Sequence, residues 1–410
     1  MQWQDIVRWG AEQKASDVFW KAGVPPSVKL QGRVTRLTDK PVLTPEDTEW
    51  LARELMTDEQ WQEFQTYPER DIGLTIGEAC RLRINIFRQQ DTCAIVMRII
   101  PLDILSIEDL ELPEVLNDIA LRPQGLVLVT GPTGCGKSTT LAAMLDLINR
   151  KRQCHIVTVE DPIEYVHRDR MSIVSQRGVG VDTADFQDAL KYAMRQAPDV
   201  ILIGEMRDTT TMSVAMQAAE TGHLVFSTVH TTSAAETMER IINMYPPHDK
   251  PQICMRMSRS LVSVLSQALV PRAGTSGRVA AIEIMVVTPT VSKFIEEGKP
   301  GEMYSAIVEG AHWGMQTMNQ ALLKLYRQGL VSADHCMHYA GNYTEMRQML
   351  RLEDGLAKDK ADADAKKAAA EAAKRKALRR QQPQQRPDAP EGTNGAAPPP
   401  PPAEPAAPDQ

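Results

Sequence analysis

Paired cysteines, long apolar runs and an excess of positive charge are all missing from this chain of 410 residues. Its 6 cysteines are scattered and none forms a Cys-x-x-Cys pair, which argues against a zinc ribbon or a redox pair and favours a reducing compartment. No apolar stretch approaches the ~20 residues that cross a bilayer. The first residues lack the basic and apolar regions of a secretory signal peptide. We therefore expect any membrane role to be peripheral.

The charge balance argues against a further class of function. The formal net charge is -7, so the chain has no basic excess with which to neutralise phosphates, and we expect no direct nucleic-acid partner. Apolar residues make up 42% and charged residues 24%, as in soluble globular proteins. At about 150 residues per domain, the length predicts two or three structural units.

Residues 1–103 are expected to form a small mixed α+β domain. An amphipathic helix begins near Ile6, and residues 44–67 have apolar positions at helical spacing. Thr44 can cap this second helical segment, and Pro45 suits its first position. Short β-like runs complete the domain, at 27–30, 81–87 and 93–100.

A linker at 104–113 leads to a second expected domain, residues 114–352. Continuous apolar runs alternate here with helical segments such as 137–150, which indicates a sheet covered on both faces. The expected strands are 126–130, 156–159, 200–203 and 224–229. We expect the region 250–352 to be mostly helical.

The composition changes after Leu352. Residues 358–380 are rich in Ala, Lys and Arg, which is compatible with a solvated helix. Residues 381–410 are dense in Pro, Ala and Gln and cannot bury enough apolar area to offset their ordering entropy. We expect the tail 353–410 to be disordered.

A glycine-rich loop follows the first strand of the second domain and opens a helix. It matches the phosphate-binding pattern G-x-x-x-x-G-K-[ST] at every position. Its residues are Gly131, Pro132, Thr133, Gly134, Cys135, Gly136, Lys137 and Ser138, with Thr139 next in the helix. Backbone N–H groups and the helix N-terminus would surround phosphate oxygens, Lys137 would reach the β- and γ-phosphates, and Ser138 would ligate Mg²⁺. An ordinary glycine-rich turn is the alternative, and the strand–loop–helix context argues against it.

Carboxylates end two of the expected strands. Glu205 follows the strand 200–203 and can hold Mg²⁺ through its water shell, although an acid capping an ordinary strand is the alternative. The cluster from Glu160 to Glu164 follows another strand, and one of its carboxylates could orient an attacking water. A turn or helix start, where acids are favoured, is the alternative for this cluster.

Two histidines flank the strand 224–229. His223 and His230 are too far apart in an extended chain to ligate one metal ion. A structural role is the alternative for each, and a γ-phosphate sensor is plausible for one of them.

Four blocks of the sequence, taken in their order along the chain, resemble the secretion ATPases of the type II and type IV pilus systems. They are the Walker A loop, an Asp box at Thr158–His167, a Walker B strand at Asp199–Asp208 and a His box at Glu220–His230. Within that superfamily the chain resembles the pilus retraction ATPases, the PilT and PilU group. Further segments that resemble those of the retraction ATPases are Lys14–Asp17, Ala22–Pro26, Arg81–Asn85, Gly204–Asp208 and Gly314–Met318.

The resemblance covers about residues 1–350 and implies a RecA-like ATPase core with a PAS-like N-terminal domain. It implies a hexameric ring that hydrolyses ATP with Mg²⁺, and Glu164 as the residue that activates water. By the same match Glu205 is the Walker B acid, while Lys137 and His230 complete the catalytic set. The family's phosphate-facing arginines and the second histidine match Arg81, Arg83, Arg98 and His223. A salt-bridged surface strand is the alternative reading of each arginine.

The function implied is a motor for pilus retraction at the inner face of the bacterial cytoplasmic membrane. Its expected partners are further copies of the chain, an inner-membrane platform protein and, as a further candidate, a paralogous pilus ATPase. An extension or type II secretion ATPase usually has a longer N-terminal region and a Cys-x-x-Cys set, both absent here. A nucleotide-binding accessory that hydrolyses poorly is a second alternative, and a DNA-handling ATPase is a third.

One segment departs from the family. The retraction motors carry the motif A-I-R-N-L-I-R-E in a C-terminal helix, where this chain has Thr290–Glu297. Ser292 and Glu296 replace the two arginines, so the local charge becomes more negative. This departure concerns how hydrolysis couples to retraction and leaves the ATPase motifs intact.

Overall fold

The computed structural model describes residues 2–30, 32–100, 103–355 and 370–371. The expectations for 358–380 and 381–410 therefore lie outside the described residues, apart from residues 370–371, which are helical. None of the helices in the described part is long and apolar enough to span a bilayer.

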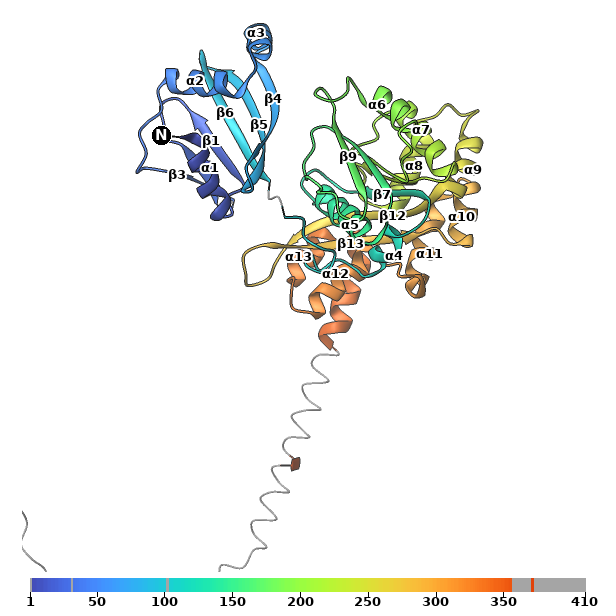
Figure 1. Ribbon diagram of the computed structural model, residues 1–410. Helices are drawn as coiled ribbons and strands as arrows, with labels where there is room; N and C mark the ends of the chain where they lie inside the picture. Colours follow the sequence, from blue (N-terminus) through green and yellow to red (C-terminus); the bar gives the residue numbers. More distant parts are fainter. Residues whose placement is uncertain (1, 31, 101–102, 356–369, 372–410) are drawn as a thin grey trace, which may run out of the picture. The chain divides into compact units, whose positions relative to one another are not determined.

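The N-terminal residues form an antiparallel sheet with three helices (Figure 1). Its strand order is β3-β2-β1-β6-β5-β4. The elements are α1 (Trp3–Glu12), β1 (Asp17–Lys21), β2 (Ser27–Leu30), β3 (Arg33–Arg36), α2 (Pro45–Leu55), α3 (Asp58–Thr66), β4 (Glu69–Ile76), β5 (Cys80–Gln89) and β6 (Thr92–Ile100). The three predicted strands match β2, β5 and β6, and the predicted N-terminal helix is α1.

The helical segment expected at 44–67 is two helices. Thr44 caps α2 as predicted, since its Oγ1 accepts from Asp47 N at 3.2 Å while Asp47 Oδ2 accepts from Thr44 N at 2.8 Å. Thr57 forms the same reciprocal pair with Gln60 and starts α3. The second capping residue divides the segment because its side chain competes for the backbone N–H groups that a continuous helix would use.

The second sheet has seven strands in the order β13-β12-β7-β11-β10-β8-β9 and is parallel except for β13. Its strands are β7 (Gly125–Thr130), β8 (His155–Glu160), β9 (Ile173–Gly178), β10 (Val200–Ile203), β11 (Leu224–Val229), β12 (Leu261–Pro271) and β13 (Arg278–Val286). Every residue of β7, β10 and β11 is buried, which is why these strands read as continuous apolar runs.

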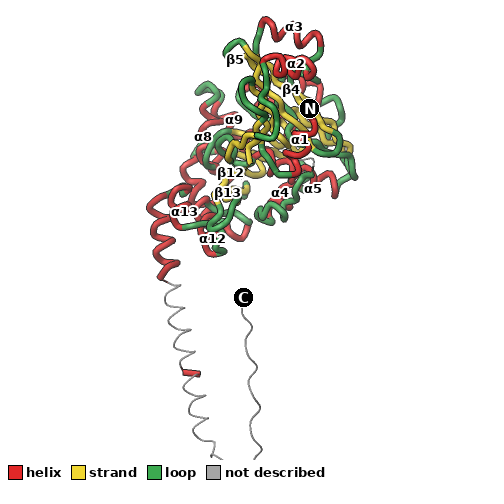
Figure 2. The backbone as a smooth tube through the Cα atoms, turned by 90° about the vertical axis from the view of Figure 1, so that its left-hand side faces the viewer, coloured by secondary structure: helices red, strands yellow, loops and turns green. Residues whose placement is uncertain are grey.

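Helices cover both faces of this sheet. The α-helices of this part of the chain are α4 (Val115–Ala120), α5 (Lys137–Lys151), α6 (Phe186–Ala193), α7 (Thr209–Glu220), α8 (Ala234–Asn243), α9 (Lys250–Ser260), α10 (Pro289–Glu296), α11 (Met303–Glu309), α12 (Met318–Arg327) and α13 (Ala333–Tyr339). The β7–α5–β8 and β10–α7–β11 connections run in opposite directions along the sheet, so right-handed crossovers place α5 and α7 on opposite faces. Figure 2 shows α4 and α5 on one side of β12 and α8 and α9 on the other.

The expectation that 250–352 is mostly helical holds for α9 but is wrong for residues 261–286. Residues 261–286 contribute β12 and β13, which form a hairpin at one edge of the sheet. Leu261 is already extended directly after α9, with no Gly or Pro to mark the change. Tertiary pairing with β7 therefore decides the conformation of this apolar segment where local signals do not.

Candidate active site

The predicted phosphate loop connects β7 to α5. Gly131, Gly134 and Gly136 all have positive φ, at 140°, 80° and 91°, a backbone region that glycine adopts without strain. Lys137 is 8% exposed, and its Nζ donates to Gly131 O at 2.8 Å and to Pro132 O at 3.2 Å. The ammonium group is thus held against the loop at the N-terminus of a long helix.

A cavity of about 660 Å³ opens beside this loop. It lies where the carboxyl ends of parallel strands meet, the usual ligand position in α/β sheets. The predicted residues that line it are Arg83, Arg98, Thr133, Gly134, Gly136, Lys137, Ser138, Thr139, Glu164, Glu205 and His230. Gly131, Pro132 and Cys135 belong to the loop but are not among its lining residues.

Glu205 follows β10 and faces His230 at the end of β11. Its side chain is 18% exposed, its Oε1 lies 2.6 Å from Arg207 Nη2, and its Oε2 lies 3.5 Å from His230 Nε2. The hydroxyl of Thr228 donates to Gly204 O at 2.7 Å and so ties the end of β11 to the turn that carries Glu205. The arrangement places a carboxylate and an imidazole together beside the phosphate loop.

The acidic cluster after β8 contains two different carboxyl environments. Glu160 is the more enclosed one: burial raises its pKa, while Thr158 Oγ1 and Gln176 Nε2 donate to its Oε1 at 2.7 and 3.1 Å. Both carboxylates line the cavity, and the Glu164 side chain is the more exposed of the two, at 38%. An accessible carboxylate suits the activation of water, so this difference in exposure favours Glu164 over Glu160 for that role.

Hydrogen bonds hold the segment that carries Glu164. Tyr165 Oη and Thr139 Oγ1 lie 2.8 Å apart, which joins the Asp box to the first turn of α5. Gln176 on β9 donates to Tyr165 O at 2.8 Å and accepts from His167 N at 2.8 Å. Sequence reasoning identified neither Tyr165 nor Gln176, because their partners are distant in the chain.

The three predicted arginines lie on β5 and β6 and make different contacts. Arg83 Nη1 lies 4.0 Å from Glu164 Oε1, and Arg81 Nε donates to Ile163 O at 3.3 Å. Arg98 Nε pairs with Asp17 Oδ1 at 3.2 Å. Arg83 and Arg98 line the cavity, whereas Arg81 is not among its lining residues.

The second histidine lies away from the cavity. His223 precedes β11, at the opposite end of that strand from His230, and its Nδ1 lies 2.9 Å from Ala218 O at the end of α7. The structure therefore brings His230, and not His223, to the other predicted residues.

Two cavity-lining cations that the sequence did not single out are Arg207 and Arg278. Arg207 belongs to the Walker B block and could have been proposed from it.

His167 at the end of the Asp box predicts a pH dependence of stability. Burial lowers its pKa from 6.5 to about 4, against a smaller opposing effect of Asp146. Between these two pH values the unfolded chain binds a proton that the folded chain does not, so stability falls as the pH falls from about 6.5 to about 4. At pH 5 the loss from this group is roughly 2 kcal/mol.

Thermal unfolding of His167→Gln at pH 8 and pH 5 checks this expectation. The variant should lose less stability on acidification than the wild type, while His248→Gln, at a side chain that is 79% exposed, should behave like the wild type. Glu160 and Glu283, whose pKa values burial raises, titrate in all three proteins, so their effects on stability cancel in the comparison. Equal acid sensitivity of the wild type and His167→Gln would contradict the prediction.

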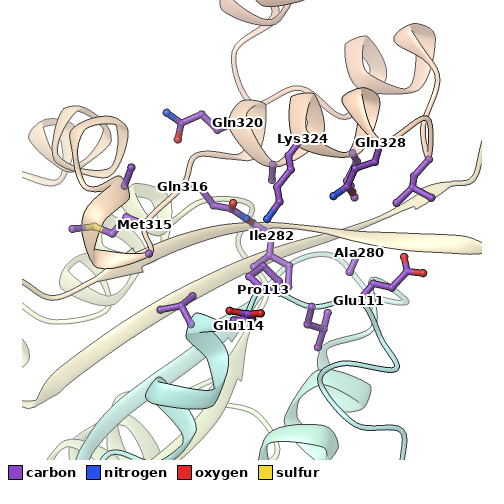
Figure 3. Close-up of a pocket in the computed structure, with 17 residues that line it drawn as sticks. Glu111, Pro113, Glu114, Ala280, Ile282, Met315, Gln316, Gln320, Lys324 and Gln328 are labelled. Carbon is purple, nitrogen blue, oxygen red and sulfur yellow. The ribbon is translucent and has the colours of Figure 1, made fainter.

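A larger cavity, of about 880 Å³, lies beside α12 and β13 (Figure 3). Figure 3 shows Lys324 and Gln328 on one side of it and Glu111 and Glu114 on the other. Gly314 lies on its wall with φ 77°, and a Cβ at that position would lie 2.6 Å from Val115 Cγ2. None of the phosphate-loop residues is among those that line this cavity.

Comparison with known proteins places most of the chain in one family. The family model described as type II/IV secretion system protein matches residues 11–386. The type IV pilus retraction ATPase PilT of Pseudomonas aeruginosa is 44% identical over 336 residues, which cover 82% of this chain and 97% of PilT. The type IV pilus ATPase PilU of the same organism is 40% identical over 352 residues, covering 86% of this chain and 92% of PilU.

A solved structure agrees with these relatives. The crystal structure of the pilus retraction motor PilT with bound ADP is 41% identical, has a TM-score of 0.80, and covers 85% of this chain and 99% of that chain. The predicted fold class, an α/β P-loop core with a smaller N-terminal domain, is confirmed. The chain is therefore a nucleotide-binding ATP hydrolase that belongs to the type II/IV secretion system protein family.

Proposed function

We propose that this chain is a hexameric motor that uses ATP hydrolysis to retract type IV pili. The observation that carries the proposal is similarity along almost the whole length of a pilus retraction ATPase. The four motif blocks meet at one cavity, which supports a single nucleotide site. The identity to PilU is nearly as high as the identity to PilT, so the assays must distinguish a primary retraction motor from a helper motor of the same system.

Within the cavity, the phosphate loop binds ATP and Lys137 contacts its terminal phosphates. The donor set suits Mg²⁺, which typically takes one or two protein oxygens together with phosphate oxygens, and Ser138 and Glu205 would hold it. When bound, Mg²⁺ would neutralise charge that develops on the phosphates. Glu164 orients and deprotonates the attacking water, and His230 senses the γ-phosphate through its position beside Glu205.

The arginines of the N-terminal domain complete the proposed site. Arg83 and Arg98 line the cavity and would neutralise charge on the transferred phosphoryl group. Arg81 is held by Ile163 O beside Glu164 and would support the same segment. His223 would act on nucleotide only indirectly, through β11.

Motion would arise between two domains, 1–103 and 114–352. We propose that hydrolysis changes the angle between them across the linker 104–113, as in hinge transitions of other nucleotide-driven machines. Copies of the chain in a ring would act in sequence on an inner-membrane platform protein from the cytoplasmic side. Pilin subunits would then return to the membrane.

Helix α10 carries the segment that departs from the family's retraction motif, and we expect it to affect how ATP hydrolysis is coupled to retraction. Ser292 Oγ donates to Ser258 O at 3.0 Å and so ties α10 to the end of α9, while Glu296 is exposed. An arginine at position 292 would not make this short contact. Pilus extension and protein secretion are the rival functions. They would use the same ATPase core and would differ in what the ring moves.

The test combines activity with motility. Purified full chain should hydrolyse ATP with Mg²⁺ as a hexamer by size-exclusion chromatography with light scattering. Expression in a piliated bacterium that lacks its own retraction ATPases should restore twitching motility and reduce surface pili. A folded hexamer that binds ATP without turnover would indicate an accessory subunit, and an increase in surface pili would indicate an extension motor.

A further inference from the structure

We propose that Gln267 is a positioning residue of the phosphate loop, and that its carboxamide sets the affinity of the loop for nucleotide. The inference rests on the nucleotide site proposed above. Gln267 lies on β12, is 4% exposed, and is not among the described residues that line the cavity. Its influence on nucleotide must therefore pass through the loop.

Two short hydrogen bonds join Gln267 to the loop and to α5. Its Nε2 donates to Cys135 O at 2.7 Å, and its Oε1 accepts from Thr140 Oγ1 at 2.7 Å. Both bonds are buried, where an unpaired polar group is costly. A carboxamide offers one donor side and one acceptor side on a single flat group, so it satisfies both partners at once.

The bond to Cys135 fixes the direction of a backbone donor. Cys135 C=O and Gly136 N–H belong to one planar trans peptide and point in opposite directions. Holding the oxygen against Gln267 turns the Gly136 N–H away from Gln267. Gly136 lines the cavity, and N–H groups at a helix N-terminus are the donors that bind phosphate oxygens.

Close packing reinforces this bridge. A Cβ on Gly131 would lie 2.4 Å from Gln267 O, and a Cβ on Gly136 would lie 2.9 Å from Gln267 Nε2. The neighbouring Ser266 Oγ accepts from Thr130 Oγ1 at 2.9 Å, which holds β12 in register at the base of the loop. The two glycines of the motif are thus required partly because Gln267 fills the space behind them.

The test is calorimetric titration of Mg²⁺ and ADP into the full chain. Gln267→Leu removes both bonds and is expected to weaken ADP binding about tenfold or more. Gln267→Glu should weaken it further at pH 8, because a carboxylate oxygen would then face Cys135 O. Lowering the pH to 6 should restore part of this loss, since a protonated carboxyl again offers a donor and an acceptor. In hydrolysis assays KM should rise more than kcat falls.

Ser263→Ala is the matched control on the same strand. Ser263 is fully buried and its Oγ donates to Met285 O at 2.7 Å, away from the loop. This variant should lose some thermal stability and keep the wild-type affinity. If Gln267→Leu does not fold, Thr140→Val removes one of the two bonds and should weaken ADP binding by itself.

The outcomes separate this inference from the site on which it rests. Wild-type affinity in the Gln267 and Thr140 variants, with only a lower melting temperature, would reduce Gln267 to a structural residue. Lys137→Ala is titrated in parallel. If Lys137→Ala also keeps its affinity, the proposed nucleotide site itself is wrong; if only Lys137→Ala loses affinity, the site stands and the role of Gln267 falls.

Discussion

Replacing Lys137 by alanine is expected to abolish measurable ATP hydrolysis. Lys137 is 8% exposed, and its ammonium group donates to two carbonyl oxygens of the phosphate loop. Loss of one fixed donor to developing negative charge costs about a hundred- to thousandfold in rate, and a full positive charge in a partly enclosed site is worth at least that. Steady-state phosphate release by the purified hexamer measures the effect.

Lys151→Ala is the control for this variant. It removes an exposed lysine from the last turn of the same helix, far from the loop, and should leave hydrolysis unchanged. The melting temperature of each variant shows whether the fold survives. A folded Lys137→Ala protein with activity near that of the wild type would contradict the assignment of the loop.

Strands buried on both faces could be predicted from the sequence because burial on both faces requires a continuous run of apolar residues. β10 and β11 begin and end where their apolar runs do. β9 could not be found in this way. It is an edge strand that includes Ser175, Gln176 and Arg177, so its pairing with β8 leaves no apolar run to recognise.

The phosphate loop could be predicted for a different reason: its chemistry is local. Eight consecutive residues supply the turn, the donors and the lysine, and the flanking strand and helix are its immediate neighbours in the chain. The support behind the loop is not local. Gln267 is 132 residues from Cys135, and the strand that carries it lies in a region that the sequence predicts to be mostly helical.

The histidines illustrate the same limit. His223 and His230 are equivalent as sequence features, one at each end of an apolar run. Only the direction of β11 in the parallel sheet decides which end meets the carboxyl ends of β7 and β10. That direction places His230 beside Glu205 and places His223 against α7.

Glu205→Gln is expected to separate binding from hydrolysis. The substitution keeps the shape of a side chain that is 18% exposed but removes the charge that faces Arg207 and His230. If Glu205 holds the Mg²⁺ shell as proposed, kcat should fall about a hundredfold or more, whereas ADP affinity should change little because the loop donors remain. Calorimetry for binding and phosphate release for turnover measure the two effects.

Glu239→Gln provides the matched control, since it neutralises an exposed carboxylate on α8. Glu239→Gln should leave both ADP affinity and kcat unchanged. A parallel loss of ADP affinity and turnover in Glu205→Gln would mean that the carboxylate shapes the loop itself. Unchanged turnover would transfer the acidic role to the cluster after β8, where Glu164 is the more exposed carboxylate and Glu160 the more enclosed one. The contrast between Lys137→Ala and Glu205→Gln therefore tests whether nucleotide binding and hydrolysis depend on different residues of one cavity.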